Sequence, residues 1–315
     1  AMTMGAVVMD RCYAGRVRHL GSDALDLLNR FSTNNTVEME DGEVRGTVIT
    51  SDKGRVAEFL FAARWTLTEA LLLTSPQNRQ KVIDWLDLYN FGEDSELEDV
   101  TESTAQIDLV GPEAGSVLEA VGVAPSEPMR AERARIAGKE VSIVRTDWPG
   151  LPCWNVVVEE QRGADVVWDA LIEAGASPAG ESAYEVVRIE RGIPVYGREL
   201  SEEVNPLEAN LMPFISWDKG CYMGQEVVAR LDTYDKVRKR LVGLRSDTPI
   251  SAGDDLRDGG RKIGTVTSAV YSPRLGRYVA LGFVRREHAA PGAALETEHG
   301  TAEVTDLAVT GAVPA

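Results

Sequence analysis

Residues 217–226 read Trp-Asp-Lys-Gly-Cys-Tyr-Met-Gly-Gln-Glu, and residues 227–231 continue as Val-Val-Ala-Arg-Leu. The two glycines of this stretch favour a tight loop with unusual backbone angles. After Gly224 the pattern becomes helical, because an acidic residue suits the first turn and apolar residues then recur at helical spacing. Cys221 is therefore predicted to lie in a loop just before a helix, two residues after Lys219.

This position makes Cys221 a candidate reactive thiol. A helix N-terminus and a nearby ammonium both stabilise a thiolate, and Lys219 supplies the ammonium. The alternative is a structural cysteine, packed as a small apolar side chain. Because its Gly, Lys, Gln and Glu neighbours are poor core material, composition leaves both interpretations open.

The chain has 315 residues, enough for two domains or for one large domain with an appendage. Its hydrophobic content of 43% allows a sizeable core. Its 50 acidic residues outnumber 33 basic ones and give a net charge of -17. This charge argues against a nucleic-acid partner or an anionic membrane surface, because both require basic patches. With no long apolar run, the protein is predicted to be soluble and cytoplasmic. The acidity fits either ordinary solubility or a salt-adapted host.

Histidine and cysteine are scarce. Cys12, Cys153 and Cys221 are odd in number and widely spaced, which makes a disulfide framework unexpected. No Cys/His spacing matches a metal site, and we assign no metal ligand. No Ser-His-Asp arrangement is evident.

Up to residue 191, hairpins alternate with helices. The predicted strands cover 9–17, 44–50, 55–63, 66–73, 104–109, 140–144 and 154–158. One predicted helix begins after Ser22 as its N-cap, and a second begins at Ser75-Pro76. Three more are predicted over residues 111–121, 164–174 and 182–191. Mixed hairpins and helices indicate an α+β fold with antiparallel sheets.

After Arg240 short strands alternate with Gly, Ser, Asp and Pro turns. The predicted strands are 240–244, 262–270, 278–284, 294–297 and 302–307. Such spacing is typical of a small β-barrel. We therefore predict an N-terminal region over 1–237 and a C-terminal barrel domain over 238–315.

At residues 219–226 the sequence resembles the signature of the YgfZ family of folate-binding proteins, which are relatives of the glycine cleavage T-protein (aminomethyltransferase). Residues 188–192, 196–197 and 205–209 resemble a block shared by both branches, and stretches between 264 and 284 resemble the family's C-terminal barrel. The resemblance implies three lobes around a central hole that accepts tetrahydrofolate. Residues 1–237 would build the first two lobes.

The resemblance also implies a function. Members of the YgfZ branch support the assembly or repair of iron–sulphur enzymes, so reduced folate and iron–sulphur client proteins are the implied partners. The alternative is a folate-dependent one-carbon transferase, an aminomethyltransferase or demethylase. A third hypothesis is a folate-binding regulatory module in which Cys221 is structural.

The site residues follow from matching positions and from the chemistry of folate. The implied catalytic groups are Cys221, Lys219 and Glu58, where Glu58 occupies the position of a T-protein carboxylate beside folate. The implied cofactor-binding residues are Arg188, Tyr196, Glu208, Trp217, Tyr222, Gln225, Glu226 and Arg230. Flat pterin and aminobenzoyl rings require aromatic or apolar walls, and the folate glutamate tail requires cations.

Several of these roles have a structural alternative. Glu58 would otherwise face solvent on a strand, Arg188 would form a surface ion pair with Glu185, and the aromatic residues would be core. The acidic residue of a T-protein Gly-Tyr-Thr-Gly-Glu segment is absent here, because residues 147–151 read Asp-Trp-Pro-Gly-Leu. Asp147 or Asn155 would have to replace it.

Overall fold

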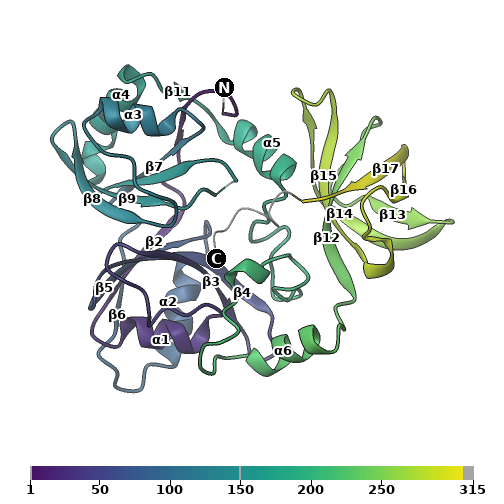
Figure 1. The fold of residues 1–315 in the computed structure, drawn as a ribbon, viewed down its shortest axis with the longest axis horizontal. Coiled ribbons are helices and arrows are strands. Elements are labelled where there is room, and N and C mark those ends of the chain that lie inside the picture. Colours follow the sequence, from purple (N-terminus) through teal and green to yellow (C-terminus); the bar gives the residue numbers. More distant parts are fainter. Residues whose placement is uncertain (1, 149, 308–315) are drawn as a thin grey trace. The chain divides into compact units, whose positions relative to one another are not determined.

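The computed structural model describes residues 2–148 and 150–307 and has the predicted α+β architecture with antiparallel sheets and a C-terminal barrel (Figure 1). The chain forms two compact units that interleave along the sequence. The first unit contains Ala1–Ile49, Glu58–Glu181 and Ser216–Tyr222, and the second contains Thr50–Ala57, Ser182–Ile215 and Met223–Ala315.

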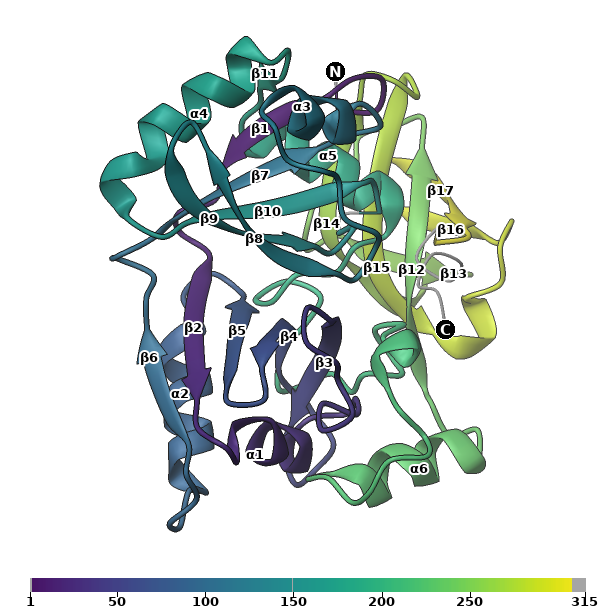
Figure 2. The same ribbon diagram turned by 60° about the vertical axis from the view of Figure 1, so that its left-hand side comes forward.

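The first unit contains a six-stranded sheet in the order β11-β1-β7-β10-β9-β8. Its strands are β1 (Val7–Asp10), β7 (Ala105–Val110), β8 (Ala131–Ile136), β9 (Lys139–Arg145), β10 (Cys153–Val158) and β11 (Ser177–Pro178). The helices α3 (Ala114–Ala120) and α4 (Ala164–Glu173) cover one face of this sheet, and η1 (Gln161–Gly163) leads into α4 (Figure 2). Alternate strand residues such as Ile107, Leu109 and Val156 pack with these helices in one core.

A five-stranded sheet of the first unit has the order β3-β4-β5-β2-β6. Its strands are β2 (Gly15–Leu20), β3 (Val44–Thr50), β4 (Val56–Thr66), β5 (Glu69–Thr74) and β6 (Glu96–Asp99), and the tip of the β3–β4 hairpin belongs to the second unit. The helices α1 (Ala24–Phe31) and α2 (Arg79–Leu88) pack on this sheet. The expected apolar face of α1 is buried, because Leu25, Leu28 and Phe31 all turn inward.

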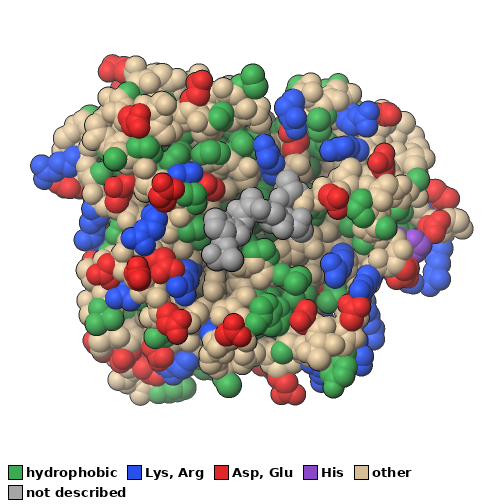
Figure 3. Space-filling model, viewed as in Figure 1, with side chains coloured by type: hydrophobic (Ala, Val, Ile, Leu, Met, Phe, Trp, Pro, Cys, Tyr) green, Lys and Arg blue, Asp and Glu red, His purple; other side chains and the backbone are tan. Residues whose placement is uncertain are grey.

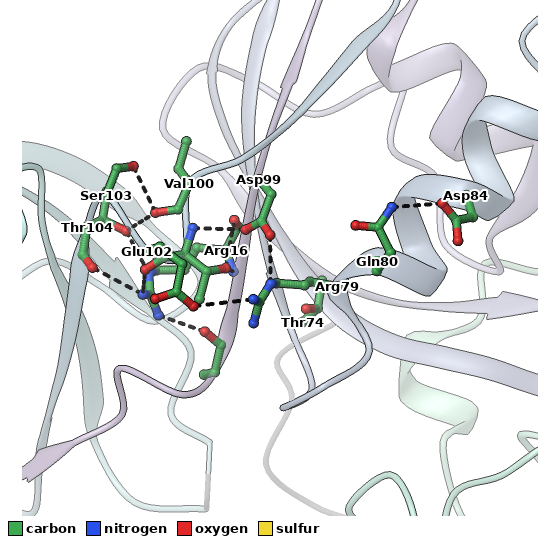
Figure 4. A network of polar contacts seen from close by, with 12 residues as sticks. Arg16, Thr74, Arg79, Gln80, Asp84, Asp99, Val100, Glu102, Ser103 and Thr104 are labelled. Atoms are coloured by element: carbon green, nitrogen blue, oxygen red, sulfur yellow. Dashed lines mark hydrogen bonds and ion pairs between the residues drawn. The ribbon is translucent and has the colours of Figure 1, made fainter.

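The chain passes between the two sheets twice, and Arg16 joins the two crossings (Figure 4). Its fully buried guanidinium donates to Ala14 O at 2.7 Å, Thr104 Oγ1 at 2.8 Å and Thr101 O at 2.5 Å. Ala14 precedes β2, whereas the two threonines lie between β6 and β7. Burial lowers the pKa of Arg16, yet its acceptors compensate for the lost hydration.

The second unit contains a closed barrel in the order β12-β15-β14-β13-β16-β17. Its strands are β12 (Lys239–Ser246), β13 (Asp255–Asp258), β14 (Arg261–Ser272), β15 (Arg277–Arg285), β16 (Ala294–Thr297) and β17 (Gly300–Thr305). The unit also contains α6 (Gln225–Thr233), η2 (Met212–Phe214), η3 (Arg286–His288) and all but the first residue of α5 (Glu181–Arg191). Apolar residues such as Val242, Leu256 and Val304 fill the barrel interior.

Several local predictions were wrong. The strand expected over 9–17 is two strands, β1 and β2, which pair in different sheets. The helix expected from 75–76 begins at Arg79, because Gln77 has a positive φ of 67°. Ser22 does not cap α1, since Asp94 accepts hydrogen bonds from its N–H and hydroxyl. The short strands β6, β8 and β13 were not predicted, because exposed polar residues mask their alternation.

Acidic and basic side chains are interspersed on the face shown in Figure 3. No helix within the described residues has the length and apolar content needed to span a membrane.

We predict that Arg16→Met lowers the free energy of unfolding by at least about 3 kcal/mol, because several buried oxygen acceptors lose their donors together. Urea unfolding followed by circular dichroism measures the loss. The control is Arg18→Met, since Arg18 is partly exposed and pairs with Glu159 at 2.7 Å. A surface pair should cost less than about 1 kcal/mol. Equal losses for the two variants would refute the assignment.

His19 predicts a pH dependence of stability. Its Nε2 lies 2.7 Å from Ser95 Oγ, its Nδ1 has no partner among the described residues, and burial lowers its pKa to about 4. The unfolded chain binds the proton more tightly, so stability should fall as the pH drops from about 6.5 to 4, by about 3 kcal/mol. Acid unfolding should show no such loss of stability in His19→Phe. The control His299→Gln, at an exposed histidine, should show the same loss as the wild type.

Candidate functional site

The loop that contains Cys221 alternates between buried and exposed residues. Lys219 is 8% exposed and Tyr222 is 7% exposed, whereas Gly220 and Cys221 between them are exposed. The Lys219 Nζ lies 5.3 Å from the centre of the Tyr222 ring, a cation–π contact. The loop thus has two buried anchors and a two-residue exposed tip.

The ammonium of Lys219 is fully hydrogen-bonded. It donates to the carbonyl oxygens of Asn29 at 2.6 Å, Ser32 at 2.8 Å and Asn34 at 2.7 Å. An ammonium has three N–H donors, so none remains for the sulphur of Cys221. Burial lowers the pKa of Lys219 to about 7. Stabilisation of a Cys221 thiolate by Lys219 therefore stays a prediction, and it would have to act through charge alone.

Among the three cysteines, Cys221 is exposed, Cys12 is half-buried and Cys153 is buried. Burial raises the pKa of the Cys153 thiol well above its ordinary value and also raises that of Cys12. The alternative of an apolar-packed Cys221 does not apply, because its side chain reaches solvent. Its reactivity stays a prediction.

The helix predicted after Gly224 is present as α6, which begins at Gln225. Gly224 has φ 82°, and a Cβ on it would lie 2.4 Å from Ser51 O, so only glycine fits without a backbone shift. Thr50 Oγ1 donates to Met223 O at 2.5 Å. Within the second unit, the β3–β4 hairpin tip therefore holds the start of α6.

Glu58 is a buried carboxylate, so the solvent-facing alternative for this residue was wrong. It is 1% exposed, accepts the backbone N–H of Ser75 at 3.1 Å and accepts a hydrogen bond from the Asn78 side-chain amide. Burial raises its pKa. A raised pKa makes proton uptake by this carboxylate easier, as a proton relay requires, but both of its oxygens already have donors.

Arg188 is fully buried, so it does not form the surface ion pair considered as an alternative. Its pairing with Glu185 is nevertheless present, at 2.6 and 2.9 Å. The other donors reach Ile193 O at 3.2 Å, Glu199 Oε2 at 3.3 Å and Ser268 Oγ at 2.8 Å. All five N–H groups are thus used within the second unit. Folate contact by Arg188 stays a prediction and would require one of these bonds to break.

The other predicted residues divide between the two units. Trp217 is 45% exposed in the first unit. The second unit holds half-buried Tyr196 and Gln225, exposed Glu226 and Arg230, and buried Glu208. Glu208 accepts the N–H of Asn205 at 3.1 Å and lies 3.5 Å from Arg55, so its carboxylate organises a turn. Cofactor contact by these residues stays a prediction.

A buried polar strip of the first unit was not predicted. On β7 and β10, the face opposite the apolar core carries Gln106, Asp108 and Asn155. Asp108 Oδ1 accepts from both amides at 2.8 Å, and Thr146 donates to Asn155 Oδ1 at 3.0 Å. Gln106 Oε1 has no partner among the described residues. The sequence signal was the alternation of polar residues in strand 105–110.

Asp147 and Asn155, the two residues considered as substitutes for the missing T-protein acid, have different surroundings. The Asp147 carboxylate is occupied by Arg145 at 2.9 and 3.2 Å and by the N–H of Cys153 at 3.1 Å. Asn155 lies in the polar strip. Next to Asp147, Trp148 packs on Phe59 and Phe61 with ring centres 5.1 and 5.9 Å away. An aromatic cluster therefore lies on β4, immediately after Glu58.

Groups of three or more His, Cys, Asp or Glu side chains arranged for a metal ion are absent from the part of the chain that the structure describes.

The antiparallel sheets and the closed C-terminal barrel define the class of protein. Residues 1–219 match the family profile of the GCVT N-terminal domain, and residues 239–312 match the glycine cleavage T-protein C-terminal barrel domain. The chain belongs to the glycine cleavage T-protein family.

Individual relatives agree with this assignment. A chloroplast protein of Arabidopsis thaliana, named as a transferase, is 32% identical over 93% of this chain and 68% of its own length. The aminomethyltransferase of Saccharopolyspora erythraea is 32% identical over 96% of this chain and 85% of its own. The crystal structure of the Bartonella henselae glycine cleavage aminomethyltransferase T shares the fold, with a TM-score of 0.88, 20% identity, and coverage of 98% of this chain and 87% of that one.

We predict that Gly224→Ala destabilises the second unit by at least about 2 kcal/mol more than Gly276→Ala. Both glycines have positive φ, 82° and 66°, but a Cβ on Gly276 meets no atom within 4 Å. The control therefore measures backbone strain alone, and the difference measures the clash with Ser51 O. Thermal unfolding of both variants gives the comparison; indistinguishable midpoints would contradict the close approach.

Proposed function

We propose that this chain is a cytoplasmic tetrahydrofolate-binding protein that acts like the YgfZ branch of its family, in the assembly or repair of iron–sulphur enzymes. The observation that carries the proposal is the exposed Cys221, displayed between buried Lys219 and Tyr222. A thiol that acts on a client protein has to reach that protein's surface, and an exposed loop tip allows this. Membership of the T-protein family supports the folate ligand.

The first unit offers suitable chemistry for a pterin. A pterin edge carries several hydrogen-bond donors and acceptors, and the strip formed by Gln106, Asp108 and Asn155 presents both types. The unpaired Oε1 of Gln106 can accept from such a ligand. Trp148 and Phe59 supply the apolar surface that flat rings require. We propose that Asn155 replaces the missing T-protein acid.

The second candidate function is folate-dependent one-carbon transfer, as an aminomethyltransferase or demethylase. Two observations favour it: relatives with about a third of their residues identical are named aminomethyltransferase, and Glu58 is a buried carboxylate with a raised pKa. In this scheme Glu58 would hold or relay a proton at a folate nitrogen. Against it, Ser75 and Asn78 already occupy the Glu58 oxygens.

Calorimetric titration with tetrahydrofolate tests the shared premise. We expect binding heat for the wild type, a reduction of at least about tenfold in affinity for Asn155→Leu, and no change for Cys12→Ala. Deleting a buried group that hydrogen-bonds the ligand is costly, whereas Cys12 lies outside the strip. The absence of heat with the wild type at high micromolar folate would remove both functions.

Complementation separates the two functions. In cells that lack this protein, the activity of an iron–sulphur enzyme should be restored by the wild type, by Glu58→Gln and by Cys12→Ala, but not by Cys221→Ala. Aminomethyl transfer to tetrahydrofolate, measured in vitro, should instead depend on Glu58 if the second function holds. If neither Cys221 nor Glu58 matters while folate still binds, the chain is a folate-binding regulatory module.

A further inference from the structure

We propose that Lys219 is a positioning residue: its ammonium caps the C-terminus of α1 and, together with Tyr222, fixes the tip from which Cys221 projects. The importance of the tip rests on the proposed function, whereas the geometry of the cap does not. Lys219 and Tyr222 are buried at i and i+3, and Gly220 and Cys221 between them are exposed. A loop pinned on both sides of a two-residue tip has little freedom to reorient its sulphur.

The acceptors of Lys219 identify the helix cap. Asn29 lies in the last turn of α1, and Ser32 is the residue that follows its end. The last carbonyl groups of a helix lack partners within the helix and carry partial negative charge, so a cation there is favourable. α1 has Arg30 in its own last turn, and it receives a second cation from a residue 190 positions away.

A second contact holds the same segment. The N–H of Ser216 donates to Thr33 O at 2.9 Å, within the loop that follows α1. Residues 216–222 therefore attach to residues 29–34 through one backbone bond and three ammonium bonds. The Lys219–Tyr222 contact lies within the attached segment itself. Burial also raises the pKa of Tyr222 to about 12, so its ring stays neutral beside the ammonium.

The cap at the end of α1 depends on pH, because Lys219 can lose its proton. Burial lowers its pKa to about 7, and the neighbouring charge of Asp26, which is paired with Arg30 at 3.1 Å, opposes this shift. A neutral amine has two N–H donors and directs a lone pair at the third carbonyl. The cap should therefore be complete below about pH 7 and weakened above it.

Spin labelling at Cys221 tests the proposal on the full chain, with Cys12→Ala as background because Cys153 is buried. We expect a restricted electron paramagnetic resonance spectrum at pH 6 that becomes mobile with a midpoint near pH 7, the pKa of Lys219. The label's rotational correlation time should fall about threefold or more. Lys219→Met should give the mobile spectrum at every pH.

The matched control is Lys239→Met. Lys239 also lies over an aromatic ring, 4.8 Å from the centre of Phe283, but among the described residues its ammonium makes no hydrogen bond to a helix end. It should leave the label and its pH dependence unchanged. If Lys219→Met does not fold, Tyr222→Leu, which retains the ammonium, should give intermediate mobility, and the wild-type titration needs no substitution. A wild-type spectrum that is mobile at pH 6 or independent of pH would overturn the proposal, whatever the outcome of the complementation assay.

Discussion

The ammonium of Lys219 is the constraint on which the candidate site depends. Burying a charged group is unfavourable unless its donors are satisfied, and three backbone carbonyls satisfy all three. Those carbonyls belong to the end of α1 and the residues after it. The cost of burying the ammonium is therefore offset only when the loop that contains Lys219 packs against the end of α1. This packing fixes the loop from which Cys221 is exposed.

Two other buried cations act in the same way. Arg16 joins the two crossings between the sheets of the first unit, mainly through backbone oxygens. Arg188 joins α5 to β14 of the barrel through Ser268, and it also pairs with Glu199. In a chain with a net charge of -17, these three cations lie inside rather than on the surface. Each connects segments that are distant in sequence, so each specifies a tertiary arrangement.

This arrangement separates the site residues that hold the structure from those that can contact another molecule. The Lys-Gly-Cys-Tyr loop combines two structural side chains with one displayed sulphur. The unusual backbone angles expected of its glycines occur at Gly224 and not at Gly220. Glu58 and the strip formed by Gln106, Asp108 and Asn155 are inward-facing polar groups of the first unit. A displayed thiol and buried polar groups suit different tasks, namely contact with a macromolecule and contact with a small ligand.

Local patterns in the sequence determined much of the fold. Alternation and apolar runs predicted β3, β7, β9, β10 and most of the barrel, and Gly224 predicted the start of α6. These features depend on neighbouring residues alone. The residues of β6 are mostly exposed on both faces of the strand, so its sequence shows no alternation of apolar and polar residues. The strand was therefore not predicted.

Only the tertiary structure decided what the charged groups do. Whether Lys219 faces a sulphur or a helix end, whether Arg188 is on the surface, and whether Glu58 meets solvent all depend on residues many positions away. A charge is stabilised by whatever acceptors surround it in space, and sequence spacing does not report them. The sequence therefore determined which residues carry chemistry, and folding decided which of them are free to use it.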